Sequence, residues 1–449
     1  MTADVPVTGE MRIPLADGLV VRQATGRDRD ALTGLQAMVH AGPGGTPSVA
    51  VGTWTSDLFD FEHPTMDLAD ITVVEDPRTG AVVSSLTLVR QTWSYAGVPF
   101  GVGRLELVAT HPDYRRRGLI TRQLRALHER SAERGDLVQA ITDLMFFHEE
   151  FGYHMALTQR AGRGGRTHEL PPAPEEGEPV TLRPATPADV PALIAIDRHA
   201  RARSLLACPR DEEHWRHELT GRSRQNMLYD ELLMVERAGA PAGYVLLGYG
   251  GIPSFPIPHW LPGLPCPEQV VSIAGFELMP EVSWQDTAPS VVRQLTGEAG
   301  YMLWLGREHP AYDVLGDLLV RRPPHMGWFL RVPDLVRFLR TVRPVLEERL
   351  SASGAAGFTG ALRLHFYTHG LLLRFREGAL VQVEPWPDHS RRGSDASMPT
   401  QMFLQLLFGH AEIPEIAPAF PDFRLQNDRA AALLPVLFPK RPSHIWPFV

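Results

Sequence analysis

Three consecutive arginines and a glycine stand directly before an amphipathic helix pattern, where they could bind phosphate. The arginines occupy positions 115–117 and Gly118 follows them. Beyond the glycine, Ile120, Leu124 and Leu127 recur at helical spacing and form one apolar stripe. The first N–H groups of a helix have no partner within it, and the helix dipole adds positive charge there. A glycine lets a ligand approach the backbone closely. The stretch therefore predicts a site for a phosphate-bearing ligand.

The residues before this loop suit a buried strand that ends in a turn. The strand pattern covers residues 105–109, and Pro112 with Asp113 ends it. Downstream, residues 137–142 form the next apolar strand pattern. Strand, loop, helix and strand would hold the arginines and Gly118 in one place.

This segment resembles the acetyl-CoA pyrophosphate loop of the GNAT acetyltransferase superfamily, Q/R-x-x-G-x-G/A. Arg115, Gly118 and Ile120 stand at the marked positions, although Ile120 replaces the usual small residue. The R-R-R-G-L form is similar to the enhanced-intracellular-survival (Eis) branch, where a bulky residue there is usual. The alternative for the arginines is a solvated basic turn.

The resemblance implies acetyl-CoA as cosubstrate, no metal, and one set of cofactor-binding residues. That set is Leu107, Val108, Ala109, Arg115, Arg116, Arg117, Gly118, Leu119, Ile120, Asp143 and Leu144. Residues 107–109 would use backbone groups alone, at a point where the sheet splays, while also forming core. Asp143 could instead cap a helix.

Acetyl transfer from a thioester to an amine needs a group that protonates the departing thiolate. This branch usually carries a tyrosine in a pattern like F-Y-x-x-x-G-Y, and His148 stands at that position here. Histidine can act as an acid near neutral pH. The alternative is that His148 is a helix histidine and the acid has been lost. Tyr153, which ends the pattern, is interpreted as structural.

The base that takes the amine proton has two candidates. Eis-type enzymes use their C-terminal carboxylate, which would be that of Val449 after an apolar tail. Glu106, on the strand before the loop, could activate the amine through water, or form a salt bridge at the strand edge. An amine pocket could draw on aromatic residues that are otherwise core: Trp54, Phe59, Phe61 and Trp93.

A sequence pattern from near the start of the chain recurs after residues 163–179. This stretch is rich in Gly, Pro and Glu and is interpreted as a linker. V-R-x-A-T-x-x-D at 21–28 returns as L-R-x-A-T-x-x-D at 182–189, and Val74-Glu75 returns as Val235-Glu236 at the same offset. Two motifs at one offset indicate a duplicated domain. The second copy has no R-x-x-G loop after residues 273–279. It is therefore expected to be a degenerate GNAT unit.

The remaining chain has another pattern, with three strands at 362–383 and helices near Thr400 and residues 430–437. It resembles the sterol-carrier-like domain that closes Eis-type proteins. Residues 326–332 and 335–350 would be a connecting strand and helix. The expected fold class is α/β (α+β): a catalytic GNAT domain at 1–165, a degenerate GNAT domain at 180–345 and a sterol-carrier-like domain at 346–449.

Composition narrows the class of protein. Of 449 residues, 44% are hydrophobic and 21% charged, as in ordinary globular proteins, and the net charge of −8 argues against broad nucleic-acid binding. The two cysteines match no zinc or redox spacing, and a cytoplasmic location is expected. The resemblance implies an N-acetyltransferase acting on an aminoglycoside-like polyamine or a lysine side chain, and a homohexamer. The alternative is a lipid- or small-molecule-binding scaffold with an inert GNAT site.

Overall fold

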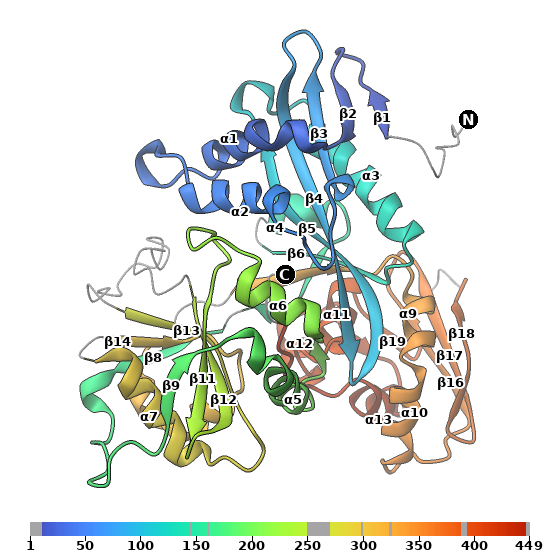
Figure 1. Ribbon diagram of the computed structural model, residues 1–449. Coiled ribbons are helices and arrows are strands. Elements are labelled where there is room, and N and C mark those ends of the chain that lie inside the picture. Colours follow the sequence, from blue (N-terminus) through green and yellow to red (C-terminus); the bar gives the residue numbers. More distant parts are fainter. Residues whose placement is uncertain are drawn as a thin grey trace.

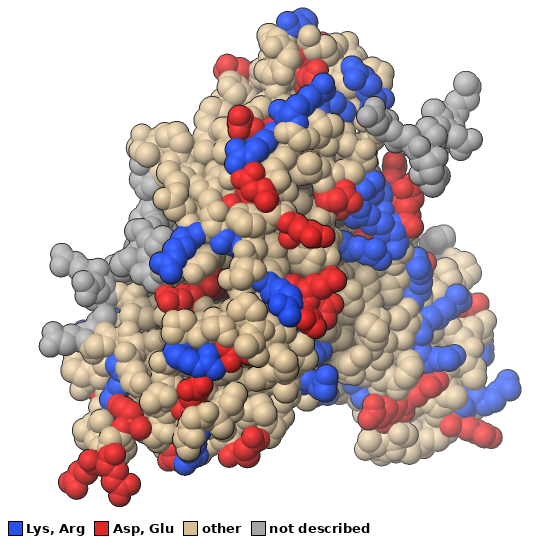
Figure 2. Space-filling view, in the orientation of Figure 1, with Lys and Arg blue, Asp and Glu red and all other residues tan. Residues whose placement is uncertain are grey.

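The chain forms three β-sheets with their helices in a computed structural model that describes residues 11–142, 145–159, 161–248, 270–297, 300–322, 326–387 and 393–445. Figure 1 shows the first sheet at the top, the second at the lower left and the third at the lower right. This mixed architecture agrees with the predicted fold class. Basic and acidic side chains are interspersed over the face shown in Figure 2. Of the helices described, none is long and apolar enough to cross a bilayer.

The first sheet follows the order β1-β2-β3-β4-β5-β6-β15-β7, and β10 pairs with β4. Its strands are β1 (Arg12–Pro14), β2 (Val20–Gln23), β3 (Ile71–Asp76), β4 (Ala81–Tyr95), β5 (Val98–Thr110), β6 (Val138–Thr142), β7 (His154–Gln159), β10 (Leu206–Ala207) and β15 (Met326–Arg331). Its helices are α1 (Arg29–Val39), α2 (Val49–Asp60), α3 (Leu119–Glu133) and α4 (Met145–Glu149). The predicted strand before the loop and the predicted amphipathic helix are both present, as β5 and α3.

The second sheet, which together with its helices is called the second unit, has the order β8-β14-β13-β12-β11-β9. Its strands are β8 (Arg163–Arg166), β9 (Thr181–Pro184), β11 (Glu231–Arg237), β12 (Ala240–Leu247), β13 (Val270–Leu278) and β14 (Gly300–Leu303). Its helices are α5 (Val190–Arg201), α6 (Glu212–Thr220), α7 (Trp284–Thr296) and α8 (Pro310–Leu315).

The duplication is visible in matching ion-pair networks. In the first sheet, Arg22 binds Asp28 at 2.7 Å and Glu75 at 2.6 Å. In the second, Arg183 binds Asp189 and Glu236, each at 2.7 Å. Both aspartates also close a capping box at a helix start. The repeated letters thus mark one structural unit used twice.

Two strands cross the expected domain boundaries. β15, expected as a connector, lies between β6 and β7, with Trp328 opposite both Thr142 and Leu157. β8, expected as part of a linker, pairs with β14 in the second sheet. Strand edges need hydrogen-bond partners, and any strand of the chain can supply them. The interpretation of residues 163–166 as linker was therefore wrong.

The third sheet, which together with its helices is called the third unit, has the order β18-β17-β16-β19-β20. Its strands are β16 (Gly360–His365), β17 (Gly370–Arg376), β18 (Ala379–Pro385), β19 (Ala396–Ser397) and β20 (Arg424–Leu425). The helices around it are α9 (Leu335–Thr341), α10 (Arg343–Ser351), α11 (Thr400–Leu407), α12 (Ile413–Ala419) and α13 (Asp428–Leu437). Phenylalanine rings fill its interior, with the Phe403 ring 5.0 Å from Phe366 and 5.4 Å from Phe438.

The tip of the long β4–β5 hairpin joins the first sheet to the third unit, and Figure 1 shows it running down toward β19. Tyr95 at this tip is fully buried, and its hydroxyl donates to the carbonyl of Leu407 at 2.8 Å. Arg349 of α10 donates to the same hydroxyl at 3.0 Å. Because one buried apolar cluster includes both the tip and the third unit, these parts share a core.

Candidate functional site

The predicted phosphate loop lies at the start of α3, on the surface. Gly118 is the N-cap of the helix and has φ +69°, a left-handed conformation that side chains rarely adopt. It is exposed, and a Cβ placed there would meet no atom within 4 Å. The first N–H groups of α3 have no partner within the helix, so they are open to an anion. The geometry therefore suits the predicted anion site.

A buried polar network fixes α3 against the sheet one turn beyond this end. Gln123 is fully buried and donates to the carbonyl and the hydroxyl of Thr72, each at 3.1 Å. Its amide oxygen accepts from the hydroxyl of Ser84 at 2.8 Å. The polar atoms of a buried side-chain amide must be hydrogen-bonded, and here all their partners lie on the sheet. This network therefore sets how α3 and its N-terminus lie on the sheet.

The arginine side chains of the loop turn back toward its backbone. Arg115 donates to the carbonyl of Thr110 at 3.3 Å, and Arg117 donates to that of Asp113 at 3.1 Å. The Arg117 guanidinium also lies over the Tyr114 ring at 4.7 Å, which is a cation–π contact. Arg116 is exposed and has φ +62°. All three remain on the surface, where they can add positive charge around the helix end.

The sheet separates beside this loop, as the predicted pantetheine site requires. The parallel ladder between β5 and β6 runs from Val102 to Arg104, whereas β5 continues to Thr110. A bulge inserts one extra residue into β5 opposite β4, and Leu107 there has φ +52°. Bulges of this kind are common next to active sites.

Two of the three expected backbone contacts already have protein partners. The carbonyl of Leu107 accepts from Gln36 of α1 at 2.5 Å. That of Ala109 lies 2.8 Å from the hydroxyl of Ser84, whose single proton it shares with the amide oxygen of Gln123. A carbonyl has two lone pairs, so a second bond is still possible. Val108 lies between them at the separation of the strands.

His148 lies in α4 and is only 1% exposed. Its ring packs edge-on against Phe147 at 5.3 Å and against Tyr153 at 6.0 Å. Its backbone carbonyl accepts from the N–H groups of Phe151 and Tyr153, which closes the turn after the helix. The histidine is thus held by aromatic neighbours rather than exposed on a helix face.

A hydrogen-bonded pair that the sequence did not indicate lies next to His148. Tyr153 is fully buried, and its hydroxyl binds Nε2 of His128 at 2.8 Å. Burial, and then the charge of Arg331, lowers the pKa of His128 to about 4, so the ring is neutral at pH 7. Burial raises the pKa of Tyr153. The structural role given to Tyr153 agrees with this position, and the spacing of His128 on α3 gave no sign of the pair.

Glu106, the second candidate base, faces a cavity beside α2. This α2 cavity consists of two adjoining hollows of about 260 Å³ each, including the parts open to solvent. Its lining comprises Trp54, Asp57, Leu58, His63, Thr87, Val89, Arg104, Glu106, Leu107, His217, Gly221, Arg222, Asn226 and Leu228. The Glu106 side chain is 12% exposed and forms an ion pair with the buried Arg104. Among the described residues, His148 lines neither hollow.

The second unit supplies one wall of the α2 cavity, which the sequence did not indicate. Asp57 of α2 accepts from the backbone and the hydroxyl of Ser223 at 2.8 Å each, and from Asn226 at 2.7 Å. The rings of His63 and His217 meet across this contact at 4.8 Å. Burial lowers the pKa of His63 to about 3 and that of His217 to about 4, so both are neutral at pH 7.

The expected aromatic lining is present in part. Trp54 lines the α2 cavity, but Phe59 packs against the core beneath α1 and Phe61 is exposed. Trp93 is fully buried and its ring meets Trp328 of β15 at 5.5 Å. Trp93 is thus core, packed against β15, a strand whose place in the first sheet the sequence did not predict.

Three expected site residues lie outside the described residues: Asp143, Leu144 and Val449. The chain before Val449 is described as far as Ile445. There the N–H of His444 donates to the carbonyl of Leu206 at 3.1 Å, and β10 in turn pairs with Ser94 and Tyr95 of β4. The tail at residue 444 therefore runs beside the first sheet.

One protein-family model matches the part of the chain that carries the glycine loop. Residues 21–156 match the model of the acetyltransferase (GNAT) domain. That range contains β5, the glycine loop and His148. No curated protein matches the sequence.

Solved structures share the fold over nearly the whole chain. A probable N-acyltransferase from Enterococcus faecalis matches with TM-score 0.67 and 12% identity, covering 96% of this chain and 100% of that one. A GCN5-related N-acetyltransferase from Anabaena variabilis gives 0.65 and 11%, covering 95% and 99%. Eis1 from Mycobacterium abscessus gives 0.57 and 15%, covering 96% and 99%. At such identities the likeness shows the fold alone.

Proposed function

We propose that the protein is an acetyl-CoA-dependent N-acetyltransferase of the Eis type, with its active site in the first domain. The observation that carries the proposal is the glycine-capped start of α3 beside the separation of β5 and β6. Phosphates of the cofactor would bind the N–H groups at Gly118, Leu119 and Ile120, and its pantetheine arm would follow β5 at Val108. The GNAT match over this range supports the assignment.

Transfer then needs an acid and a base at the thioester. His148 would stabilise the departing thiolate, either as an imidazolium that transfers a proton or as a neutral imidazole whose one N–H donates a hydrogen bond. Glu106, or the carboxylate of Val449, would accept the amine proton, directly or through water. Glu106 is favoured by its place on the wall of the α2 cavity, one residue before the bulge at Leu107.

The acceptor would enter through the α2 cavity, and its chemistry follows from the lining. Both lining carboxylates are already engaged, Glu106 by Arg104 and Asp57 by Ser223 and Asn226. Two neutral histidines and Trp54 complete much of the wall. Such a lining suits an amine with one positive charge, such as a lysine side chain, better than a polycation.

The test is turnover of acetyl-CoA by the full chain, measured as free thiol against a panel of amines. The panel should contain a lysine peptide, a small aromatic amine and an aminoglycoside. Thiol release that requires one of these amines supports the proposal. Cofactor binding without turnover on any amine would leave a binding protein, and no binding would refute the assignment.

A further inference from the structure

The second sheet has a cavity at the place where its own strands separate. β13 and β14 pair in parallel up to Ile273 and Leu303, and β13 continues to Leu278, much as β5 continues beyond Arg104. Glu277, past the last of these pairs, lines a space of about 560 Å³, including the part open to solvent. The second unit therefore lacks the glycine loop but has a cavity at the corresponding separation.

One arginine in this cavity is buried with unused hydrogen-bond donors. The Arg210 side chain is 3% exposed, and its guanidinium lies over the Trp215 ring at 4.2 Å. One terminal nitrogen lies 3.8 Å from a carboxylate oxygen of Asp197. Among the described residues, its Nε and its other terminal nitrogen have no hydrogen-bond partner. Leaving buried donors unpaired is costly, so a bound acceptor would stabilise them.

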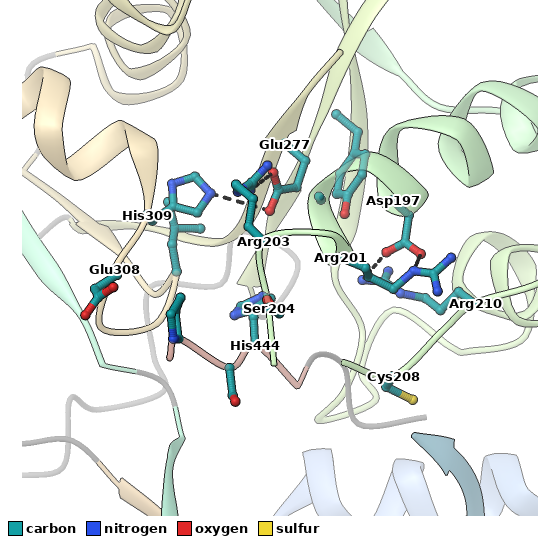
Figure 3. Close-up of a pocket in the computed structure, with 15 residues that line it drawn as sticks. Asp197, Arg201, Arg203, Ser204, Cys208, Arg210, Glu277, Glu308, His309 and His444 are labelled. Carbon is teal, nitrogen blue, oxygen red and sulfur yellow. Dashed lines mark hydrogen bonds and ion pairs between the residues drawn. The ribbon is translucent and has the colours of Figure 1, made fainter. Parts of the chain in front are cut away.

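The other charges of the cavity are matched in close pairs. Asp197 binds Arg201 at 2.8 Å, and Glu277 binds Arg203 at 2.5 Å and lies 3.5 Å from His309 (Figure 3). The arginines of the two close pairs are Arg201 and Arg203. Within the part of the chain that the structure describes, the third arginine of the lining, Arg210, has only the longer 3.8 Å contact with Asp197. Glu308 also lines the cavity, but it is exposed at the rim. This balance suits a ligand with a single negative charge.

The C-terminal tail forms one wall. Leu205 donates its N–H to the carbonyl of Pro442 at 2.7 Å, and Ser443 and His444 line the space. Burial lowers the pKa of His444 to about 4, so its ring is neutral at pH 7. A neutral ring has one N–H, which can donate to an anion. A ligand here would therefore contact both the second unit and the tail.

We propose that this cavity binds a small monocarboxylate through Arg210, with Ser443 and His444 of the tail closing over it. The carboxylate would satisfy the unpaired guanidinium donors and neutralise the unmatched charge. A dianion would exceed that charge and meet repulsion from Asp197 and Glu277. The proposal does not depend on acetyl transfer in the first domain.

Calorimetric titration of the full chain with acetate, in a carboxylate-free buffer and with saturating acetyl-CoA, tests this directly. Saturable acetate binding is expected, with inorganic phosphate and chloride binding at least tenfold more weakly. Arg210→Met should weaken acetate binding at least tenfold. Because that change could disturb folding, Ala200→Met provides a second variant, which fills the cavity from α5 while keeping every charge.

Arg198→Met is the control, since it removes an exposed arginine from α5, the helix that carries Ala200, without changing the lining of the cavity. It should bind acetate as the unchanged protein does. Failure of the unchanged protein to bind acetate would overturn the proposal. So would acetate binding that survives Ala200→Met, or equal affinity for chloride or phosphate.

Discussion

Replacing Gly118 by aspartate would place a carboxylate where a phosphate of the cofactor is proposed to bind. The backbone there has φ +69°, so any side chain costs about 1 kcal/mol of folding stability. Space is no obstacle, because an added Cβ meets no atom within 4 Å. Gly118→Asn has nearly the same shape and the same backbone cost, without the charge. The difference between the two variants therefore isolates the electrostatic effect.

Two unit charges about 4 Å apart repel by about 1 kcal/mol in water and by about 4 kcal/mol at the effective dielectric of a protein surface. Gly118→Asp should therefore bind acetyl-CoA between about fivefold and about 10³-fold more weakly than Gly118→Asn. The assay is calorimetric titration, with thermal melts to show that both variants fold. Equal affinity in the two folded variants would refute the placement of phosphate at α3.

Three further outcomes are expected. His148→Ala should lower turnover by about 10²-fold or more while leaving cofactor affinity intact, and His148→Tyr should restore turnover; unchanged turnover in the alanine variant would make His148 a bystander. In thermal melts, Arg22→Met should destabilise the protein by about 3 kcal/mol, since it leaves the buried carboxylate of Asp28 and the partly buried one of Glu75 without this partner. Arg183→Met should cost about 1 kcal/mol because Arg183 is 37% exposed, and equal losses would contradict this. Burial holds the pKa of folded His63 near 3, below its unfolded value, so the stabilisation from this group is complete above about pH 6.5 and is lost as pH falls toward 3. In thermal melts between pH 6.5 and 4, His63→Phe should therefore lose less stability than the unchanged protein. Equal losses of stability in the two proteins would contradict this burial of His63.

Local patterns predicted the elements that carry the loop. Leu124 and Leu127 are buried on the face of α3 that meets the sheet, as their spacing indicated. The repeated A-T-x-x-D letters correspond to a capping box of Thr25 with Asp28, and the same arrangement recurs at Thr186 with Asp189. These features depend on interactions within a few residues, which a sequence displays directly.

Long-range packing could not be predicted in the same way. The sequence gives β15 a strand pattern but does not show that it enters the first sheet between β6 and β7. Nor does it show that His217 reaches the α2 cavity, or that Gln36 takes the carbonyl of Leu107. Each of these contacts joins segments far apart in the chain, and its partner is chosen by the packing of whole units.

The number of acetyl-CoA molecules bound per chain tests the central claim most directly. The first unit has the glycine-capped helix start, whereas α7 of the second unit begins after Ser283, with no glycine loop. Calorimetric titration of the full chain should therefore give one saturable acetyl-CoA site per chain, which Gly118→Asp weakens. No binding, two equal sites, or a single site untouched by Gly118→Asp would contradict the account.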